Sequence, residues 1–320
     1  MRRVSEEEIA LYGTVYNNSN RVEESIHSIE KALSSTGIRS SVNIVDNFSD
    51  DGTYELLLKL SDEYGNINIV REKCNRGKGR NLALNLCPSG SMVTYVDLDS
   101  AYNECFAILL SNGIDFVKKG MLVIAQKFIY GYRDRFIDIG GWKSLNYGED
   151  LEFFVRATRA IPYVAIPVLI SEDEVVQGER ERRYERGMRF YLRKLICDID
   201  KVRGSGMGLK YTISYYGNGK NVLSSLLKKA ASVCMYIYAR ARGIYFYGDV
   251  HNIELYNRLF LEGLLLPDEI GLPKTTPLVF AISIKDEMVR KLQSKGIACS
   301  ISEIERLYVV TATPTASDLP

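Results

Sequence analysis

Asp97 and Asp99 flank a single apolar residue directly after a short hydrophobic run, residues 92–96. A run this short, preceded by turn residues, predicts a buried strand. The carboxyl end of such a strand would present both carboxylates at the sheet edge where α/β proteins bind ligands. Two neighbouring carboxylates repel each other unless a cation compensates, and oxygen ligands suit Mg²⁺ or Mn²⁺. A solvated turn explains the pair alone equally well, because Asp is a common turn residue.

Four further polar segments also follow predicted strands or open a predicted helix. In a parallel sheet the carboxyl ends of the strands meet at one edge, so these segments are expected to gather there. They are residues 16–18, 46–53, 75–81, and 140–142 together with 147–150.

The segment 75–81 combines glycines with basic side chains before a predicted helix. Gly77 and Gly79 would allow close backbone approach, and a helix amino terminus favours anions, so the segment suits a diphosphate. A solvated basic turn is the simpler interpretation of this loop taken alone. The three cationic residues are Arg76, Lys78 and Arg80.

Carboxylates in two other segments have both a functional and a structural interpretation. Asp46, at the end of a predicted strand, could accept a hydrogen bond from a nucleobase or ribose, or cap the next helix. Glu149 and Asp150 could supply a general base, or complement the dipole at a helix amino terminus. The chain contains neither GxxxxGK nor GxGxxG, which argues against a Walker-type loop and the simplest dinucleotide site.

The first half of the chain alternates strand and helix patterns, which predicts an α/β fold with a mostly parallel sheet. A helical, Tyr-, Arg- and Lys-rich extension follows, in which Tyr184 belongs to the helical pattern. A small α/β appendix with a β-α-β pattern and a tail, residues 313–320, come next. The predicted domains are residues 1–175, 176–265 and 266–320. The predicted strands are 9–16, 41–45, 67–70, 92–96, 121–129 and 163–170, and the predicted helices are 21–33, 54–60, 81–86 and 151–159.

Composition limits the class of protein. The 320 residues carry a net charge of +1, which gives no global field for nucleic acid. Six scattered Cys and two His argue against zinc and suit a reducing cytoplasm. The basic start is followed by acids, and no stretch of about 20 apolar residues occurs, so neither a signal peptide nor a membrane-spanning helix is expected.

The stretch 207–248 contains six basic residues, seven Tyr and no acid. We expect one or two amphipathic helices here, with an apolar face packed on the α/β domain. The alternative is contact with an anionic membrane surface. The expected apolar face consists of Leu223, Leu226, Leu227, Ala230, Cys234 and Ile237.

In order and approximate spacing, these segments resemble family 2 glycosyltransferases with the GT-A fold. The resemblance rests on Asn17, the run 45–53, the run 75–81, Asp97-x-Asp99, and Gly140-Gly141 followed by 148–150, and it covers roughly residues 8–172. It implies a GT-A-like, Rossmann-like sheet with helices on both faces. It also implies inverting transfer of a sugar from a nucleotide-diphosphate donor to an acceptor hydroxyl.

Carried over residue by residue, the resemblance implies a role for each site residue. Asp99 would be the direct ligand of Mn²⁺ or Mg²⁺, and Asp97 would face the ribose or the metal. Asp150 would be the general base, with Glu149 its neighbour or substitute. Because the site beyond Asp99 has no obvious His ligand, the protein shell of the metal is expected to be small. The nucleoside would contact Tyr16, Asn17 and Asp46, and the diphosphate would lie near Arg80 and Lys78.

Two other functions are compatible with the same pattern. A sugar-nucleotide nucleotidyltransferase shares a related sheet and metal chemistry, but residues 16–19 lack the Gly-rich, Arg-containing loop expected after its first strand. The second compatible function is that of a catalytically inactive binding module with the GT-A fold. The expected partners are a nucleotide-sugar and a glycan or lipid-linked acceptor, with no nucleic acid; an anionic membrane surface, a membrane-peripheral cytoplasmic location and a homo-oligomer are all compatible with the sequence.

Overall fold

The computed structural model describes residues 7–171, 188–295, 297, 299–304 and 307–312. The predicted domain boundary at 175, the predicted helical position Tyr184 and the predicted tail 313–320 lie outside the described residues. The three-domain division stays a prediction.

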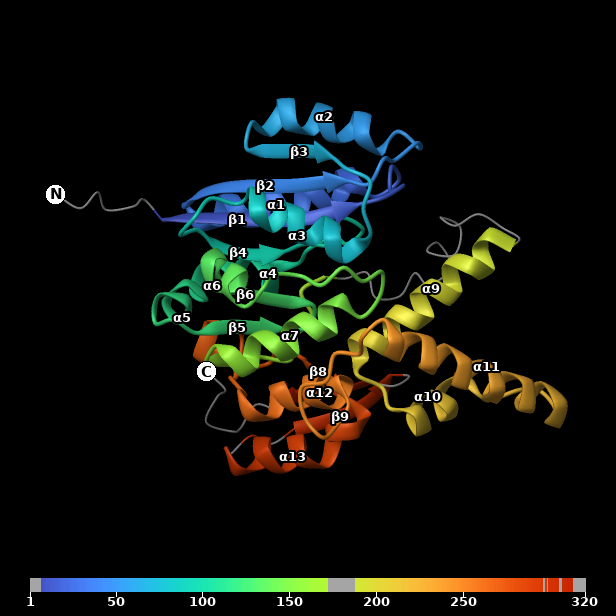
Figure 1. Ribbon diagram of the computed structural model, residues 1–320. Helices are drawn as coiled ribbons and strands as arrows, with labels where there is room; N and C mark the ends of the chain where they lie inside the picture. The colour runs from blue at the N-terminus through green and yellow to red at the C-terminus, as the bar shows by residue number, and fades with distance from the viewer. Residues whose placement is uncertain (1–6, 172–187, 296, 298, 305–306, 313–320) are drawn as a thin grey trace.

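A seven-stranded mixed sheet forms the centre of the molecule, in the order β3-β2-β1-β4-β6-β5-β7 (Figure 1). The pairs of β1 with β2 and β4, of β2 with β3 and of β5 with β7 are parallel, whereas β6 is antiparallel to both of its neighbours. The expected mostly parallel α/β sheet is confirmed. The strands are β1 Glu8–Val15, β2 Arg39–Asp46, β3 Ile67–Arg71, β4 Met92–Tyr95, β5 Leu122–Ala125, β6 Phe128–Tyr132 and β7 Tyr163–Ala165.

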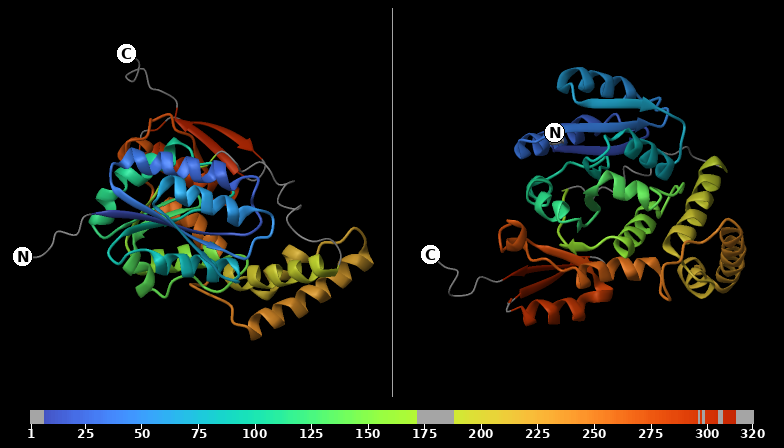
Figure 2. Two further views of the ribbon diagram at one scale, coloured as in Figure 1. Left: turned by 90° about the horizontal axis from the view of Figure 1, so that it is seen from above. Right: turned by 60° about the vertical axis from the view of Figure 1, so that its left-hand side comes forward.

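Helices cover both faces of this sheet (Figure 2). On one face α1 packs against α2 and α4, and on the other α3 packs against β1 and β2. Each begins where the sequence offers a short polar segment after a strand, as the crossover connections of parallel strands require. The helices are α1 Val22–Thr36, α2 Thr53–Tyr64, α3 Arg76–Leu86, α4 Glu104–Asn112, α5 Ile114–Lys118, α6 Arg133–Asp138 and α7 Glu149–Ala160.

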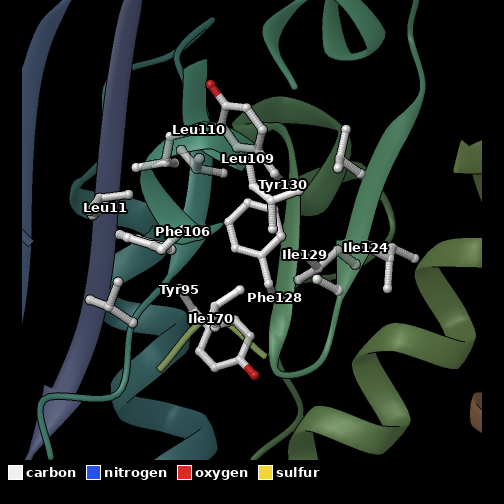
Figure 3. Close-up of a cluster of buried hydrophobic side chains, with 14 of the residues drawn as sticks. Leu11, Tyr95, Phe106, Leu109, Leu110, Ile124, Phe128, Ile129, Tyr130 and Ile170 are labelled. Atoms are coloured by element: carbon white, nitrogen blue, oxygen red, sulfur yellow. The ribbon is translucent and has the colours of Figure 1, made fainter. Parts of the chain in front are cut away.

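The hydrophobic core lies between the sheet and these helices. Around Phe106 and Phe128, aromatic and aliphatic side chains from β1, β4, α4, β5 and β6 interdigitate (Figure 3). The two phenylalanine rings meet edge to face, with centroids 5.9 Å apart. Strands buried on both faces lack a regular polar alternation, which explains why their sequences read as continuous apolar runs.

Two of the predicted strands are wrong in detail. Residues 121–129 form the hairpin β5–β6 rather than one strand, because Lys127 adopts a left-handed turn conformation with φ 55°. The strand predicted over 163–170 ends at Ala165, and Ser171 makes only an isolated bridge to Tyr102. Helices α4, α5 and α6, between Asp99 and Gly140, were not predicted.

The helical extension consists of α9 Met188–Ser205, α10 Leu209–Tyr216 and α11 Val222–Ala241, which project from the sheet domain (Figures 1 and 2). The predicted packing of its apolar face is wrong. On α11 the buried side chains are Ser232, Met235 and Ala239, whereas the predicted face points to solvent. The helix packs through these three residues, so its leucines lie on the exposed side. Among the described residues, none of the helices is long and apolar enough to cross a membrane.

The C-terminal part begins with α12 Asn252–Glu262, which packs on α7, and continues into a small α/β unit. The expected β-α-β appendix has one more strand than predicted, and its sheet is antiparallel in the order β8-β10-β9. Its core is continuous with the main core through residues such as Phe260 and Phe280. Its elements are the 3₁₀ turns Pro267–Ile270 and Ile282–Ile284, β8 Leu278–Ala281, α13 Lys285–Ser294, β9 Cys299–Ile304 and β10 Leu307–Ala312.

Candidate active site

The Asp97 segment lies at the point where the strand order of the sheet reverses. From β1 the chain runs outward through β2 to β3, and it then returns to place β4 on the other side of β1. The backbone N–H of Val96 donates to the carbonyl oxygen of Tyr12 at 2.8 Å, so the residues after β4 leave the sheet beside the end of β1. Crevices of this kind are where open α/β sheets bind ligands.

The segments after β1 and β2 are bound to each other through Asn17. Its side-chain amide donates to Asp50 Oδ1 at 2.8 Å, and its Oδ1 accepts from the Asp50 backbone N–H at 3.1 Å. Asn17 has φ 47°, a left-handed conformation that Asn tolerates better than most residues. The Asn17 side chain therefore shapes this wall of the crevice, and Tyr16 beside it is half-buried.

Asp46 is completely buried at the end of β2. Its carboxylate accepts the backbone N–H of Ser49 at 3.1 Å and the Nε–H of Arg71 at 3.1 Å. The Arg71 guanidinium lies over the rings of Phe48 and Tyr54, 5.1 and 4.4 Å from their centroids. Asp46 thus stabilises the turn that leads to α2 and holds Arg71 at the sheet edge. It does not cap α2, the alternative considered above, because the N-cap of that helix is Gly52. Arg71 was not predicted; it directly follows the predicted strand 67–70.

Arg80 forms the electrostatic centre of the site. Its side chain is 3% exposed and lies between Tyr95 and Trp142, 4.4 and 4.9 Å from the ring centroids. One terminal nitrogen donates to Asp97 Oδ1 at 2.5 Å and the other to Glu149 Oε1 at 2.9 Å. One buried cation therefore joins the carboxylates of two segments that are 52 residues apart in the chain (149 − 97).

The pKa values of these groups follow from burial and from this pairing. Burial would lower the pKa of Arg80, but Asp97 and Glu149 outweigh it and raise the pKa further above its usual range. Burial would raise the pKa of Asp97, yet the charges of Arg80 and Arg76 leave it below its ordinary value. For Glu149 burial dominates and raises the pKa, although the same two arginines oppose it. Of the two carboxylates paired with Arg80, Asp97 is therefore the one held more firmly in its charged form.

Segment 75–81 is not the flexible basic loop that the sequence suggested. It is the first turn of α3, capped by Asn75, whose Oδ1 accepts from the Lys78 backbone N–H at 2.8 Å. A Cβ on Gly77 would lie 1.9 Å from the carbonyl oxygen of Lys143, and one on Gly79 would lie 2.4 Å from Thr14 Oγ1. Close packing therefore requires both glycines, Gly77 against the backbone of Lys143 and Gly79 against the side chain of Thr14. The Lys78 side chain is half-exposed and pairs with Glu72 at 3.0 Å.

Gly141 and Trp142 connect this helix to the acidic segment. Gly141 has φ 56°, and a Cβ there would lie 2.0 Å from the side chain of Asn81, so only glycine fits. The backbone N–H of Trp142 donates to Asn81 Oδ1 at 2.9 Å, and its indole N–H donates to the Tyr12 hydroxyl at 3.0 Å. The indole stacks on Phe153 with centroids 4.2 Å apart. Trp142 thereby anchors the start of α7 to the sheet.

Glu149 and Asp150 open α7, but they lie in different environments. Glu149 is 1% exposed, paired with Arg80 and 3.6 Å from Arg76. Asp150 is half-buried, and its Oδ1 accepts the backbone N–H of Leu151 at 2.8 Å. Of the two acids, Asp150 is the one whose carboxylate is accessible to a substrate.

Helix α9 of the helical extension contacts the residues directly before α7. Asp200 on α9 accepts the backbone N–H of Asn146 at 2.8 Å, and Arg203 holds Asp200 at 3.0 Å. A Cβ on Gly204 would lie 2.4 Å from the carbonyl oxygen of Gly148, so α9 approaches the start of α7 closely. These contacts were not predicted, since nothing in the pattern of α9 shows which loop it meets.

Aromatic side chains surround Lys201 at the surface next to the start of α7. The Lys201 ammonium lies 5.1 Å from the ring centroid of Tyr147 and 4.5 Å from that of Tyr215, and it donates to the Tyr215 hydroxyl at 2.6 Å. Both rings are nearly half-exposed, at 46% and 43%. An exposed aromatic and cationic surface therefore begins two residues before Glu149.

Tyr102 positions the Asp97 backbone. Its hydroxyl accepts the Asp97 N–H at 2.7 Å and donates to the Asp97 carbonyl oxygen at 3.2 Å, which holds the turn containing Asp99. In the part of the chain that the structure describes, no group of three or more His, Cys, Asp or Glu side chains could hold a metal ion. Any metal here would depend on few protein ligands, a donor set that suits Mg²⁺ or Mn²⁺ with water and phosphate completing the shell.

Solved structures with a partly similar chain course include glycosyltransferases. A mannosyltransferase of Pyrobaculum calidifontis, solved with GDP-Man and Mn²⁺, is 13% identical over 73% of this chain and 74% of its own, with a TM-score of 0.46. TarS of S. aureus, residues 1–349 with UDP, is 12% identical over 94% of this chain and 95% of its own, with a TM-score of 0.43. Among curated proteins, no sequence matches this chain.

The family comparison bears directly on the motif segments. Residues 14–135 match the model of glycosyl transferase family 2. The match contains Asn17, Asp46, the start of α3 and Asp97-x-Asp99, while Glu149 and Asp150 lie beyond its end. The resemblance noted in the sequence is thereby confirmed over residues 14–135.

Proposed function

We propose that this protein is an inverting glycosyltransferase that moves a sugar from a nucleotide-diphosphate donor to an acceptor hydroxyl. The observation that carries the proposal is that Arg80 binds both Asp97 and Glu149. Asp97 follows β4, where the strand order reverses, and Glu149 is the neighbour of Asp150. Arg80 thereby joins the Asp97 segment, which we assign to the donor, and the start of α7, which carries Asp150, in one site. The family match over residues 14–135 supports it.

In this proposal the donor lies along the carboxyl edge of the sheet. The nucleoside contacts Tyr16 and the walls formed by Asn17 and Asp46, with Arg71 and the half-exposed Phe48 beside it. Lys78 lies at the exposed start of α3, within the reach of a diphosphate. We assign Arg80 to holding Asp97 and Glu149 in place, rather than to the diphosphate contact that the sequence suggested, because its side chain is 3% exposed.

Asp99, with Asp97 behind it, would hold Mn²⁺ or Mg²⁺. The residues fit such an ion because both offer carboxylate oxygens, and Asp97 keeps its charge through Arg80. When bound, the metal would neutralise charge that develops on the departing diphosphate.

Asp150 acts as the general base. Its carboxylate takes the proton of the acceptor hydroxyl as that oxygen bonds to the sugar C1, and the C1–O bond to the diphosphate breaks with its electron pair leaving on the diphosphate. Attack opposite the leaving group inverts C1. Glu149 is its neighbour and, being buried against Arg80, positions the helix start. The acceptor, a glycan or a lipid-linked molecule, approaches past Tyr147 and Lys201.

A binding screen followed by a turnover assay tests this function. Nucleotide-sugars are screened by thermal shift with and without Mn²⁺ or Mg²⁺; a ligand at 100 times its Kd stabilises by about 2.7 kcal/mol. Release of nucleoside diphosphate and transfer are then measured for the parent, Asp99→Ala and, as a matched control, the exposed Asp115→Ala on α5. Release of pyrophosphate from a nucleoside triphosphate and a sugar 1-phosphate would instead identify a nucleotidyltransferase, and donor binding without turnover would identify a binding module.

A further inference from the structure

An unpartnered apolar stripe runs along the outer side of α11. Leu223, Leu226 and Leu227 are 67%, 65% and 63% exposed, and Ile237, three turns further on, is 61% exposed. Side chains three and four residues apart lie on one helix face, so these residues form a continuous line. The buried residues of α11 lie on the opposite side, where the helix packs against α9 and α10.

We propose that this stripe docks α11 onto an anionic lipid bilayer, with the helix axis in the plane of the surface. The helix is 20 residues long, which corresponds to about 30 Å of contact. In Figure 1 it extends away from the sheet, so no other described element of the chain covers its outer side. An interfacial helix buries one apolar face at the boundary between headgroups and acyl chains and keeps cations beside it.

Charge selects an anionic surface. Residues 207–248 contain no acid, and three of their basic residues, Lys220, Lys229 and Arg242, lie at the ends of the stripe or beside it. Lys220 precedes the helix and Lys229 lies beside its first turns, both exposed. Near the other end, Arg242 donates to the Tyr238 hydroxyl at 3.2 Å, an arrangement suited to the boundary between water and lipid.

The same charges disfavour a second copy of this chain as the occupant. A two-fold interface places the same surface of both copies face to face. Pairing through α11 would therefore place Lys220 and Lys229 of one copy against the same basic surface of the other, and residues 207–248 offer no acid to compensate. Anionic headgroups offer the missing negative charge, and acyl chains can bury the leucines.

A small hollow at the start of the stripe is lined by both polar and apolar residues. It lies where α11 follows α10 and is lined by Asn221, Ser225 and Lys229 on its polar side and by Val222 and Leu226 on its apolar side. Val222 is 89% exposed. A phosphate-bearing headgroup could meet Lys229 here while its acyl chains meet the leucines.

Vesicle flotation without any nucleotide-sugar tests the docking. The full chain is mixed with phosphatidylcholine vesicles, with or without phosphatidylglycerol, at low and high salt. We expect association only with the anionic vesicles, and weaker association as salt rises, because the Debye length is about 8 Å at physiological ionic strength. No flotation with anionic vesicles at low salt would overturn the proposal.

Two pairs of variants separate the stripe from general surface effects. Leu223→Ser with Leu226→Ser should weaken the partition to anionic vesicles at least about tenfold, since each exposed leucine loses its transfer from water to lipid. The matched control, Leu58→Ser with Leu86→Ser, removes two other exposed leucines, on α2 and α3, and should leave binding unchanged. Equal losses in both pairs would contradict a role for α11.

Charge is tested in the same way. Lys220→Glu with Lys229→Glu should weaken binding at low salt by roughly tenfold or more, because each basic residue near an anionic surface contributes about 1 kcal/mol. Lys31→Glu with Lys59→Glu, at exposed positions of the sheet domain, is the control. If sedimentation shows a dimer that the leucine pair converts to monomer, and vesicles do not bind, the face is an interface between copies. Because flotation needs no donor, its result is independent of the transfer activity.

Discussion

Replacing Arg80 with Met should destabilise the protein strongly, because it removes a buried cation from between two carboxylates. Met retains much of the apolar volume between Tyr95 and Trp142, so the loss is mainly electrostatic. Removing one partner of a buried ion pair costs about 3–5 kcal/mol. Asp97 is one-third exposed, and Arg76 lies 3.6 Å from Glu149, so we expect the lower end, about 3 kcal/mol.

The measurement is the free energy of unfolding, with the melting temperature as a second reading. A loss of about 3 kcal/mol corresponds to a fall of roughly 6 °C or more. The same substitution at Arg258, whose ion pair with Glu262 spans 3.8 Å at the surface, is the control and should cost less than about 1 kcal/mol.

A second substitution tests the cause. Glu149→Gln in the Arg80→Met background removes the acid that has lost its partner. The double variant should therefore be more stable than the sum of the two single losses, by a coupling of about 0.5–3 kcal/mol. If Arg80→Met unfolds no more easily than the Arg258 control, or if the two losses simply add, then Arg80 is not the electrostatic centre of the site.

Three further predictions concern the reaction and its pH dependence. Asp99→Ala should abolish donor binding that depends on Mn²⁺ or Mg²⁺ while the melting temperature stays near that of the parent; full transfer activity in EDTA would contradict the assignment. Asp150→Asn should keep donor affinity within a few-fold but lower turnover by about 10²–10⁴, the usual contribution of a general base; greater damage from Glu149→Gln would reverse the two roles. Asp97 has a lowered pKa in the folded state, so its stabilising contribution is present above its unfolded pKa of about 3.9 and disappears as the pH falls through the folded value. Asp97→Asn should therefore destabilise the protein at pH 7, and the difference from the parent should shrink in acid; a difference that grows in acid would contradict this.

The local pattern was sufficient to predict most of the first half of the fold. Strands β1 to β4 and helices α1, α2 and α7 occur where apolar runs and helical spacing predicted them. The β5–β6 hairpin was missed because its turn at Gln126 and Lys127 lacks the usual Gly, Asn or Asp. The sequence also contained the polar segments of the site, because each directly follows a strand or opens a helix.

Residue types and their spacing alone therefore established the α/β fold, the acidic and basic segments of the site and the resemblance to family 2 glycosyltransferases. Three-dimensional packing assigned Arg80 to the interior between Asp97 and Glu149, and the glycines of α3 to close contacts with neighbouring segments. It also turned the leucines of α11 outward. Periodicity identifies which residues share a face, but whether that face is buried depends on which other element reaches it. That depends on contacts between segments far apart in the chain, which no local pattern encodes.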